Sequence, residues 1–230
     1  MKPLEQAIET ARTLKILNNP GKACVMGPER DQLYTHEFVG GNFTVTSLLG
    51  SQEHADIARK RLQSAAELTL IPPETVEQGN IATVGVTVTN VGAGHNLPTS
   101  LTEVRQMWIE VVVTDTTGST IYHSGKLDYE GNIDPKAKMF NARAVDAKGK
   151  HTYKPWEINR FEYNYTIPPK GSSTTDYTFL VPVGIKGPLK VSATLRYRSY
   201  PQSLANQLLG KDSITLPIVD MVQKEMEIQL

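Results

Sequence analysis

The hydrophobic pattern changes its period near residue 71, and this change most constrains what the chain can fold into. Over residues 51–68 apolar side chains recur on one face at a spacing near 3.6, which predicts a helix. Pro72 and Pro73 then interrupt the pattern. Beyond them apolar and polar residues alternate, as in half-buried strands. We therefore expect a helical segment over residues 1–70 and a β domain over residues 71–230.

The β domain contains several short alternating stretches separated by turn residues. Strands are expected over residues 106–115, 160–167, 175–182 and 189–198, with a hairpin over 114–125. This spacing is typical of a sandwich, so we predict a mainly β protein with an α-helical N-terminal part and an antiparallel immunoglobulin-like β-sandwich. The chain has one cysteine, Cys24, so the sandwich is expected to lack an internal disulfide.

Charge and hydropathy exclude two classes of partner. The 230 residues carry 24 Lys and Arg against 24 Asp and Glu, and this zero net charge argues against a nucleic-acid-binding protein. No apolar run approaches the roughly 20 residues that span a bilayer, so no membrane span is expected. The first residues are amphipathic and include Glu5 and Glu9, which does not fit a signal peptide. The chain is therefore expected to be cytoplasmic or a piece of a longer precursor.

The sequence contains none of the common catalytic motifs. HExxH, CxxC, GxSxG, GxGxxG and P-loop patterns do not occur. Thr99 and Ser100 carry hydroxyl groups, but nothing in the sequence assigns either one a general base. We therefore expect a non-catalytic protein.

The stretch VTNVGAGHNLPTS places a histidine, His95, in a turn-rich loop after an expected strand. Asn90, two glycines and Pro98 surround it, so one interpretation is a histidine that bonds backbone groups and holds the loop. The other interpretation is a ligand, because a neutral imidazole on a rigid loop can be presented to a metal.

A second candidate site is the loop KLDYEGNIDP, which spaces oxygen-bearing side chains two residues apart. Asp128, Glu130, Asn132 and Asp134 alternate around a glycine, which resembles a calcium loop in outline. The spacing differs from that of an EF-hand, and the alternative is a polar loop between strands.

A series of spaced motifs runs through residues 88–134: a V-x-N turn, a GH-x-x-PT loop, an Arg-x-x-W strand, a V-x-D-x-x-G turn, a Ser-Gly pair and a D-x-x-G-x-I loop. THEFVGGN (35–42) precedes this series, and LRYRSYP (195–201) follows it. Together these motifs, over about residues 20–200, resemble the C-terminal β-sandwich domain of multihaem c-type cytochromes.

This resemblance implies a role in electron transfer outside the cytoplasm, in the periplasm or the extracellular space. Haem irons in such cytochromes are usually held by two histidines, and one of them can come from a distant segment. The resemblance therefore implies that His95 or His36 is a distal haem ligand. It also implies a haem-bearing cytochrome domain or subunit as the partner.

The chain departs from the family at the haem-attachment motif, which needs C-x-x-C-H. In GKACVMGP, Cys24 matches the second cysteine, but Gly21 and Val25 replace the first cysteine and the histidine. We therefore expect a degenerate site that does not hold haem covalently in the normal way. The alternative to a haem role is a haem-free immunoglobulin-like binding or assembly module.

Overall fold

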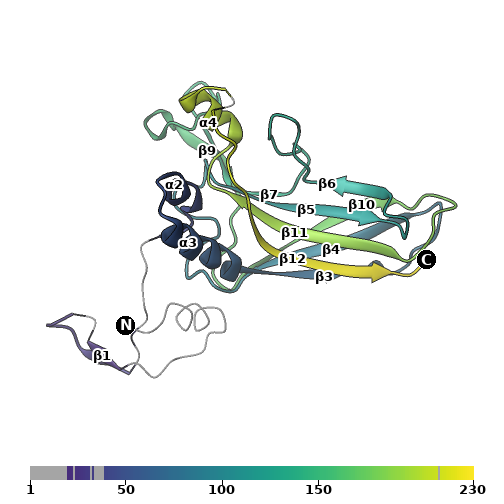
Figure 1. Cartoon of the computed structure of the whole chain (residues 1–230), viewed down its shortest axis with the longest axis horizontal. Coiled ribbons are helices and arrows are strands. Elements are labelled where there is room, and N and C mark those ends of the chain that lie inside the picture. Colours follow the sequence, from purple (N-terminus) through teal and green to yellow (C-terminus); the bar gives the residue numbers. More distant parts are fainter. Residues whose placement is uncertain (1–19, 23, 32, 34–38, 212) are drawn as a thin grey trace.

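Two antiparallel sheets packed face to face form the main body of the protein, and helices cover one end of it (Figure 1). The structure is a computed structural model that describes residues 20–22, 24–31, 33, 39–211 and 213–230. Residues 1–19, the amphipathic start of the expected helical segment, lie outside the described residues. No helix in the described part of the chain combines the length and apolar character needed to cross a bilayer.

The first sheet has three strands in the order β10-β4-β3. They span Ala66–Ile71 (β3), Ile81–Asn90 (β4) and Ser172–Leu180 (β10). Alternation sets the faces: Val84, Val86 and Val88 point into the protein and are fully buried. On the outer face threonines pair across the strands, with Thr87 Oγ1 lying 2.8 Å from Thr174 Oγ1.

The second sheet has the strand order β12-β11-β5-β6, with β7 pairing beside β5. Its strands span Gln106–Thr114 (β5), Thr120–Ser124 (β6), Met139–Phe140 (β7), Leu189–Arg198 (β11) and Val219–Ile228 (β12). β5 and β6 form the expected hairpin, and β11 has the expected bounds. In chain order, β3, β4 and β10 take the places of immunoglobulin strands A, B and E, while β5, β11 and β12 take those of C, F and G. The predicted immunoglobulin-like β-sandwich is confirmed.

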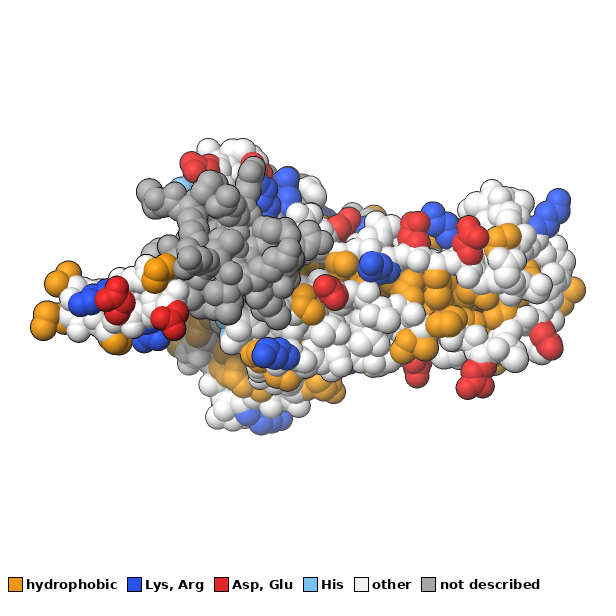
Figure 2. Space-filling view, turned by 90° about the horizontal axis from the view of Figure 1, so that it is seen from below, with side chains coloured by type: hydrophobic (Ala, Val, Ile, Leu, Met, Phe, Trp, Pro, Cys, Tyr) orange, Lys and Arg blue, Asp and Glu red, His pale blue; other side chains and the backbone are white. Residues whose placement is uncertain are grey.

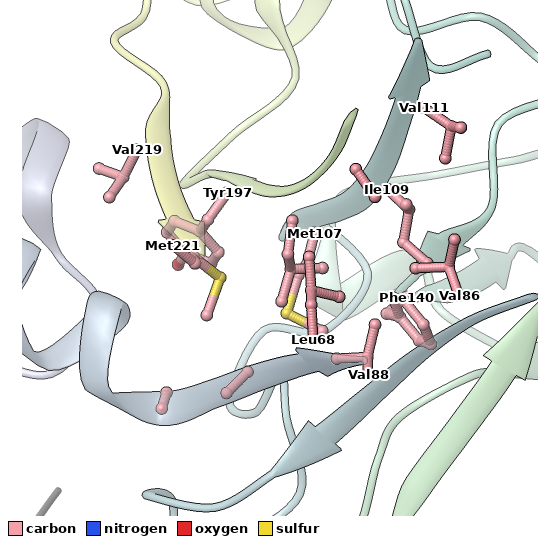
Figure 3. Close-up of a cluster of buried hydrophobic side chains, with 14 of the residues drawn as sticks. Leu68, Val86, Val88, Met107, Ile109, Val111, Phe140, Tyr197, Val219 and Met221 are labelled. Atoms are coloured by element: carbon pink, nitrogen blue, oxygen red, sulfur yellow. The ribbon is translucent and has the colours of Figure 1, made fainter. Parts of the chain in front are cut away.

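The core lies between the two sheets, where inward side chains of both interdigitate (Figure 3). Leu68, Val86 and Val88 of the three-stranded sheet lie opposite Met107 and Ile109 of β5. All five side chains are at most 3% exposed. This burial supplies the main stabilisation, since apolar area removed from water contributes about 25 cal/mol per Å².

Two helices close one end of the sandwich and share its core. They are α2 (Phe43–Leu48) and α3 (Gln52–Ala65). The apolar face of α3, including Ile57 and Leu62, belongs to the same buried cluster as the sheet residues. The helix expected to reach residue 68 ends at Ala65 instead, because the next six residues pair with β4 as β3.

Other short elements lie near the same end, over the outer side of the five-stranded sheet (Figure 1). They are β8 (Ala142–Val145), η1 (Pro155–Glu157), β9 (Arg160–Asn164) and α4 (Gln202–Leu209). β9 ends before the expected residue 167, and Ile167 instead forms an isolated bridge with Leu97. β10 begins at residue 172 and ends at 180, slightly earlier than expected at both ends.

A small hairpin projects from the body, made of β1 (Gly21–Lys22) and β2 (Glu29–Arg30). Its tip carries Cys24, Val25 and Met26, and hydrophobic side chains are visible there (Figure 2). Val25 and Met26 are 90% and 94% exposed, so the degenerate attachment motif forms an open hairpin tip.

Candidate functional site: the His95 loop

The loop that follows β4 is held by one buried side chain, that of Asn90. Its Nδ2 donates to the main-chain oxygens of His95, at 2.9 Å, and Ile167, at 3.1 Å. Its Oδ1 accepts from the Ala93 main-chain N–H at 3.0 Å. Because Asn90 is only 1% exposed, these bonds are shielded from water and fix the path of the loop.

Further contacts tie the loop to its neighbours on both sides. Leu97 exchanges two main-chain hydrogen bonds with Ile167, at 2.8 and 2.9 Å. At the other side, the Gly92 N–H donates to the Ala65 carbonyl at the end of α3. A Cβ on Gly92 would lie 2.1 Å from the Ser64 carbonyl oxygen, so only glycine fits there. The loop is therefore attached to both the helical cap and the sandwich.

The imidazole of His95 is exposed on this fixed loop. Its Nδ1 lies 2.9 Å from the main-chain oxygen of Asn96. A carbonyl can only accept, so Nδ1 must carry the hydrogen and Nε2 must carry the lone pair in the neutral ring. Nε2 has no partner among the described residues. This arrangement leaves Nε2 chemically able to bind a metal ion or a haem iron.

Most other residues of the cytochrome-like motif series serve the fold. The Arg105 guanidinium donates to the Ser199 carbonyl at 3.1 Å and lies 3.5 Å from Asn42 Oδ1. Trp108 is fully buried and donates to the Gly125 carbonyl. Arg105 thus joins the sandwich to Asn42, the last residue of the THEFVGGN segment. His95 differs from these residues because its ring bonds only to the adjacent residue.

The three carboxylates of the predicted calcium loop do not point at one centre. Asp128 Oδ1 accepts from the main-chain N–H groups of Glu130, at 2.9 Å, and Asn132, at 2.8 Å. Glu130 lies 4.0 Å from the Lys211 ammonium, and Asp134 accepts from the Lys136 N–H of its own turn. Within the described residues, no group of three or more His, Cys, Asp or Glu side chains could hold a metal ion.

Asp128 instead forms a turn that occurs three times among the described residues. Asp115, Asp128 and Asp146 each accept main-chain hydrogen bonds from the residues two and four positions later. Hydrogen bonds from the Asn132 side chain and main chain hold the pKa of Asp128 below its usual value. The polar-loop alternative therefore accounts for this geometry.

The remaining candidate haem residues lie apart from His95 or outside the described chain. Cys24 is an exposed free thiol at the hairpin tip, where Val25 provides no proximal ligand. His36 lies outside the described residues. Attachment of haem through two cysteines does not fit a chain with one cysteine, whereas axial ligation by His95 would use its free Nε2.

A polar pocket of about 170 Å³ was not anticipated from the sequence. It is lined by Glu103, Gln106, Met139, Asn141, Ala142, Arg143, His151, Tyr153, Tyr163 and Pro201. These residues come from separate loops and strands, and no local motif marks them. The only available sequence signal was a glutamate beside the strand that contains Trp108, which is too common a feature to predict a site.

Comparison with known proteins agrees with the sandwich architecture. The chain is similar to a penta-haem cytochrome c552 from Thermochromatium tepidum, with a TM-score of 0.58 and 17% identity. The match covers 74% of this chain but only 41% of the cytochrome, so the chain spans less than half the length of that protein. At this identity the likeness shows a shared fold alone.

A CARDB domain from Pyrococcus furiosus, solved with di-metal ions, also matches, with 10% identity over 71% of this chain and 85% of that domain. Its TM-score of 0.32 is too low to support an argument about this chain. No protein-family model matches the chain, and no curated protein matches it.

Proposed function

We propose that this chain is a non-catalytic β-sandwich domain or subunit of a multihaem c-type cytochrome that transfers electrons in the periplasm or outside the cell. In this proposal a partner domain or subunit holds the haem, and His95 supplies a distal imidazole to its iron. When bound, the haem carries the electron, and the residues of this chain position the ligand and dock the partner.

The observation that carries the proposal is the state of the His95 ring. It is exposed, its Nδ1 donates to the Asn96 carbonyl, and its Nε2 lone pair is free. The Asn90 side chain fixes the loop by donating a hydrogen bond to the main-chain oxygen of His95. A rigid loop lowers the entropic cost of presenting a ligand, because little freedom remains to be lost on binding.

The contact between the sandwich and the helical part is a second support. Arg105 lies against Asn42, and a Cβ on Gly41 would lie 3.1 Å from Tyr197 Oη. The Gly-Gly-Asn segment, which belongs to the cytochrome-like motifs, is thus packed closely on the sandwich.

The proposal is tested by titrating the protein with a haem c peptide that has its own proximal histidine and an open sixth position. We expect the Soret band to shift to the low-spin form as His95 binds the iron. His95→Ala should abolish most of the shift, whereas His54→Ala, which removes another exposed histidine, should leave it unchanged. An unaltered shift in His95→Ala, or an equal loss in both variants, would refute ligation by His95.

A haem-free assembly module is the second candidate, and the hairpin tip favours it. Val25 and Met26 expose nearly all of their apolar surface on a projecting element, which is typical of residues that become buried against a partner. Binding of a cytochrome partner that is lost in Met26→Ser but gives no spectral change would support this function instead of haem ligation.

A further inference from the structure

The polar pocket beside the start of β5 is lined by five separate stretches of chain. Glu103 and Gln106 precede and begin β5, Asn141 lies between β7 and β8, and His151 and Tyr163 come from the region around β9. Its volume of about 170 Å³ is similar to that of an engineered cavity of about 150 Å³ that binds benzene. The pocket can therefore hold a ligand of about six to eight non-hydrogen atoms.

Two acceptors in the pocket lack donors. Glu103 is only 5% exposed, and no described residue forms a hydrogen bond or ion pair with its carboxylate. Asn141 Oδ1 is buried and likewise receives no hydrogen bond within the described structure. An unsatisfied buried acceptor such as Asn141 Oδ1 is costly, and the Glu103 carboxylate beside it has no donor among the described residues. Both atoms would be satisfied by a ligand that donates hydrogen bonds.

The cations nearest the pocket are engaged with other groups. Arg143 Nε donates to Glu162 at 2.7 Å. Arg198 donates to Gln106 Oε1, at 2.9 and 2.6 Å, and to the Gly131 carbonyl at 2.8 Å. None of these bonds reaches Glu103, so its negative charge is available to a ligand.

The remaining lining groups suit a cation with an apolar part. Burial lowers the pKa of His151, and the positive charge of Arg143 lowers it further, so the ring is neutral at pH 7 and adds no competing charge. Tyr153 and Tyr163 line the same pocket, and Tyr163 stacks on Tyr165 with ring centroids 4.7 Å apart. Aromatic rings attract cations at their faces and pack against alkyl groups.

We propose that this pocket binds a small organic molecule that carries a protonated primary amine. The ammonium group pairs with the Glu103 carboxylate and donates to Asn141 Oδ1, while its carbon chain packs among the tyrosines. The site is independent of haem, because no residue of the His95 loop lines it.

The test uses the full chain and n-butylammonium as the probe, with butan-1-ol as a neutral counterpart of similar size. Binding is followed by isothermal titration calorimetry and by amide NMR shifts at the pocket residues. We expect butylammonium to bind and butan-1-ol to bind at least about tenfold more weakly, because a hydrogen bond to a charged group is worth more than a neutral one.

Two variants locate the interaction. Glu103→Gln should weaken butylammonium binding about tenfold or more, whereas Glu74→Gln, which neutralises an exposed carboxylate elsewhere, should not change it. Equal binding of the amine and the alcohol, no binding at all, or unchanged binding in Glu103→Gln would overturn the proposal.

Discussion

The indole Nε1 of Trp108 donates a hydrogen bond of 3.0 Å to the main-chain carbonyl of Gly125. Trp108 lies on β5 between two residues that face the sandwich core, so its own side chain is on the outer side of the sheet. It is nevertheless fully buried. The bond therefore holds the chain after β6 over the outer face of the sheet, at the end where the candidate sites lie.

Substitution of Gly125 should be much more destabilising than substitution of a comparable glycine. Gly125 has φ +82°, and a Cβ there would lie 2.5 Å from the Ile109 carbonyl oxygen. Gly118 has φ +83° but nothing within 4 Å of an added Cβ. Gly118→Ala should cost about 1–2 kcal/mol of unfolding free energy from backbone strain alone. Gly125→Ala should cost about 1–3 kcal/mol more, because of the steric clash. Urea denaturation measures both, and equal costs would contradict the close approach.

Asn90→Ala should destabilise the protein by about 2–4 kcal/mol, because it removes three hydrogen bonds and leaves the His95 carbonyl and the Ala93 N–H without their side-chain partner. His95→Ala should change the unfolding free energy by no more than about 0.5 kcal/mol, since that ring is exposed. Urea denaturation of the two variants therefore distinguishes Asn90, which stabilises the loop, from His95, whose side chain is exposed on it. A large loss in His95→Ala would favour the purely structural interpretation of this histidine.

The Asp128 turn should make a pH-dependent contribution to stability. Its pKa in the folded protein is below the usual 3.8, so the contribution is present above that value and is lost as the pH falls through the lower, folded-state pKa. Asp128→Asn should therefore reduce the difference in unfolding free energy between neutral and strongly acidic pH.

The melting temperature with and without added calcium tests the same loop for metal binding. Since the Asp128 carboxylate is occupied by main-chain and Asn132 donors, added calcium should leave the melting temperature unchanged. A rise that saturates with calcium and disappears in Asp128→Asn would show that the loop binds the metal after all.

Leu68→Ala tests whether residues 66–71 belong to the sheet. Leu68 is 3% exposed and points into the core from β3, so its truncation should cost about 2–5 kcal/mol. Leu49→Ala should cost little, because Leu49 is 79% exposed. Denaturation curves with similar midpoints for the two variants would contradict the placement of β3.

Local patterns of the sequence were sufficient to predict much of the sandwich. Alternation over residues 189–198 predicted the bounds of β11, and the Thr-Thr-Gly-Ser turn predicted the β5–β6 hairpin. The reason is that a period of two follows from strand geometry itself. The same method misassigned residues 66–68 to a helix, because Ala66 and Leu68 fit a helical face as well as a strand.

For the candidate sites too, some features followed from the sequence and others only from the tertiary structure. The sequence by itself singled out His95, because a histidine among turn residues and within a familiar motif series is a local feature. Only the tertiary structure decided that its Nε2 is free, since this depends on the Asn96 carbonyl and on the loop path that Asn90 holds. Only the tertiary structure also brought Glu103, Asn141 and His151 to one pocket. Their proximity results from long-range strand pairing and loop packing, which no local period encodes.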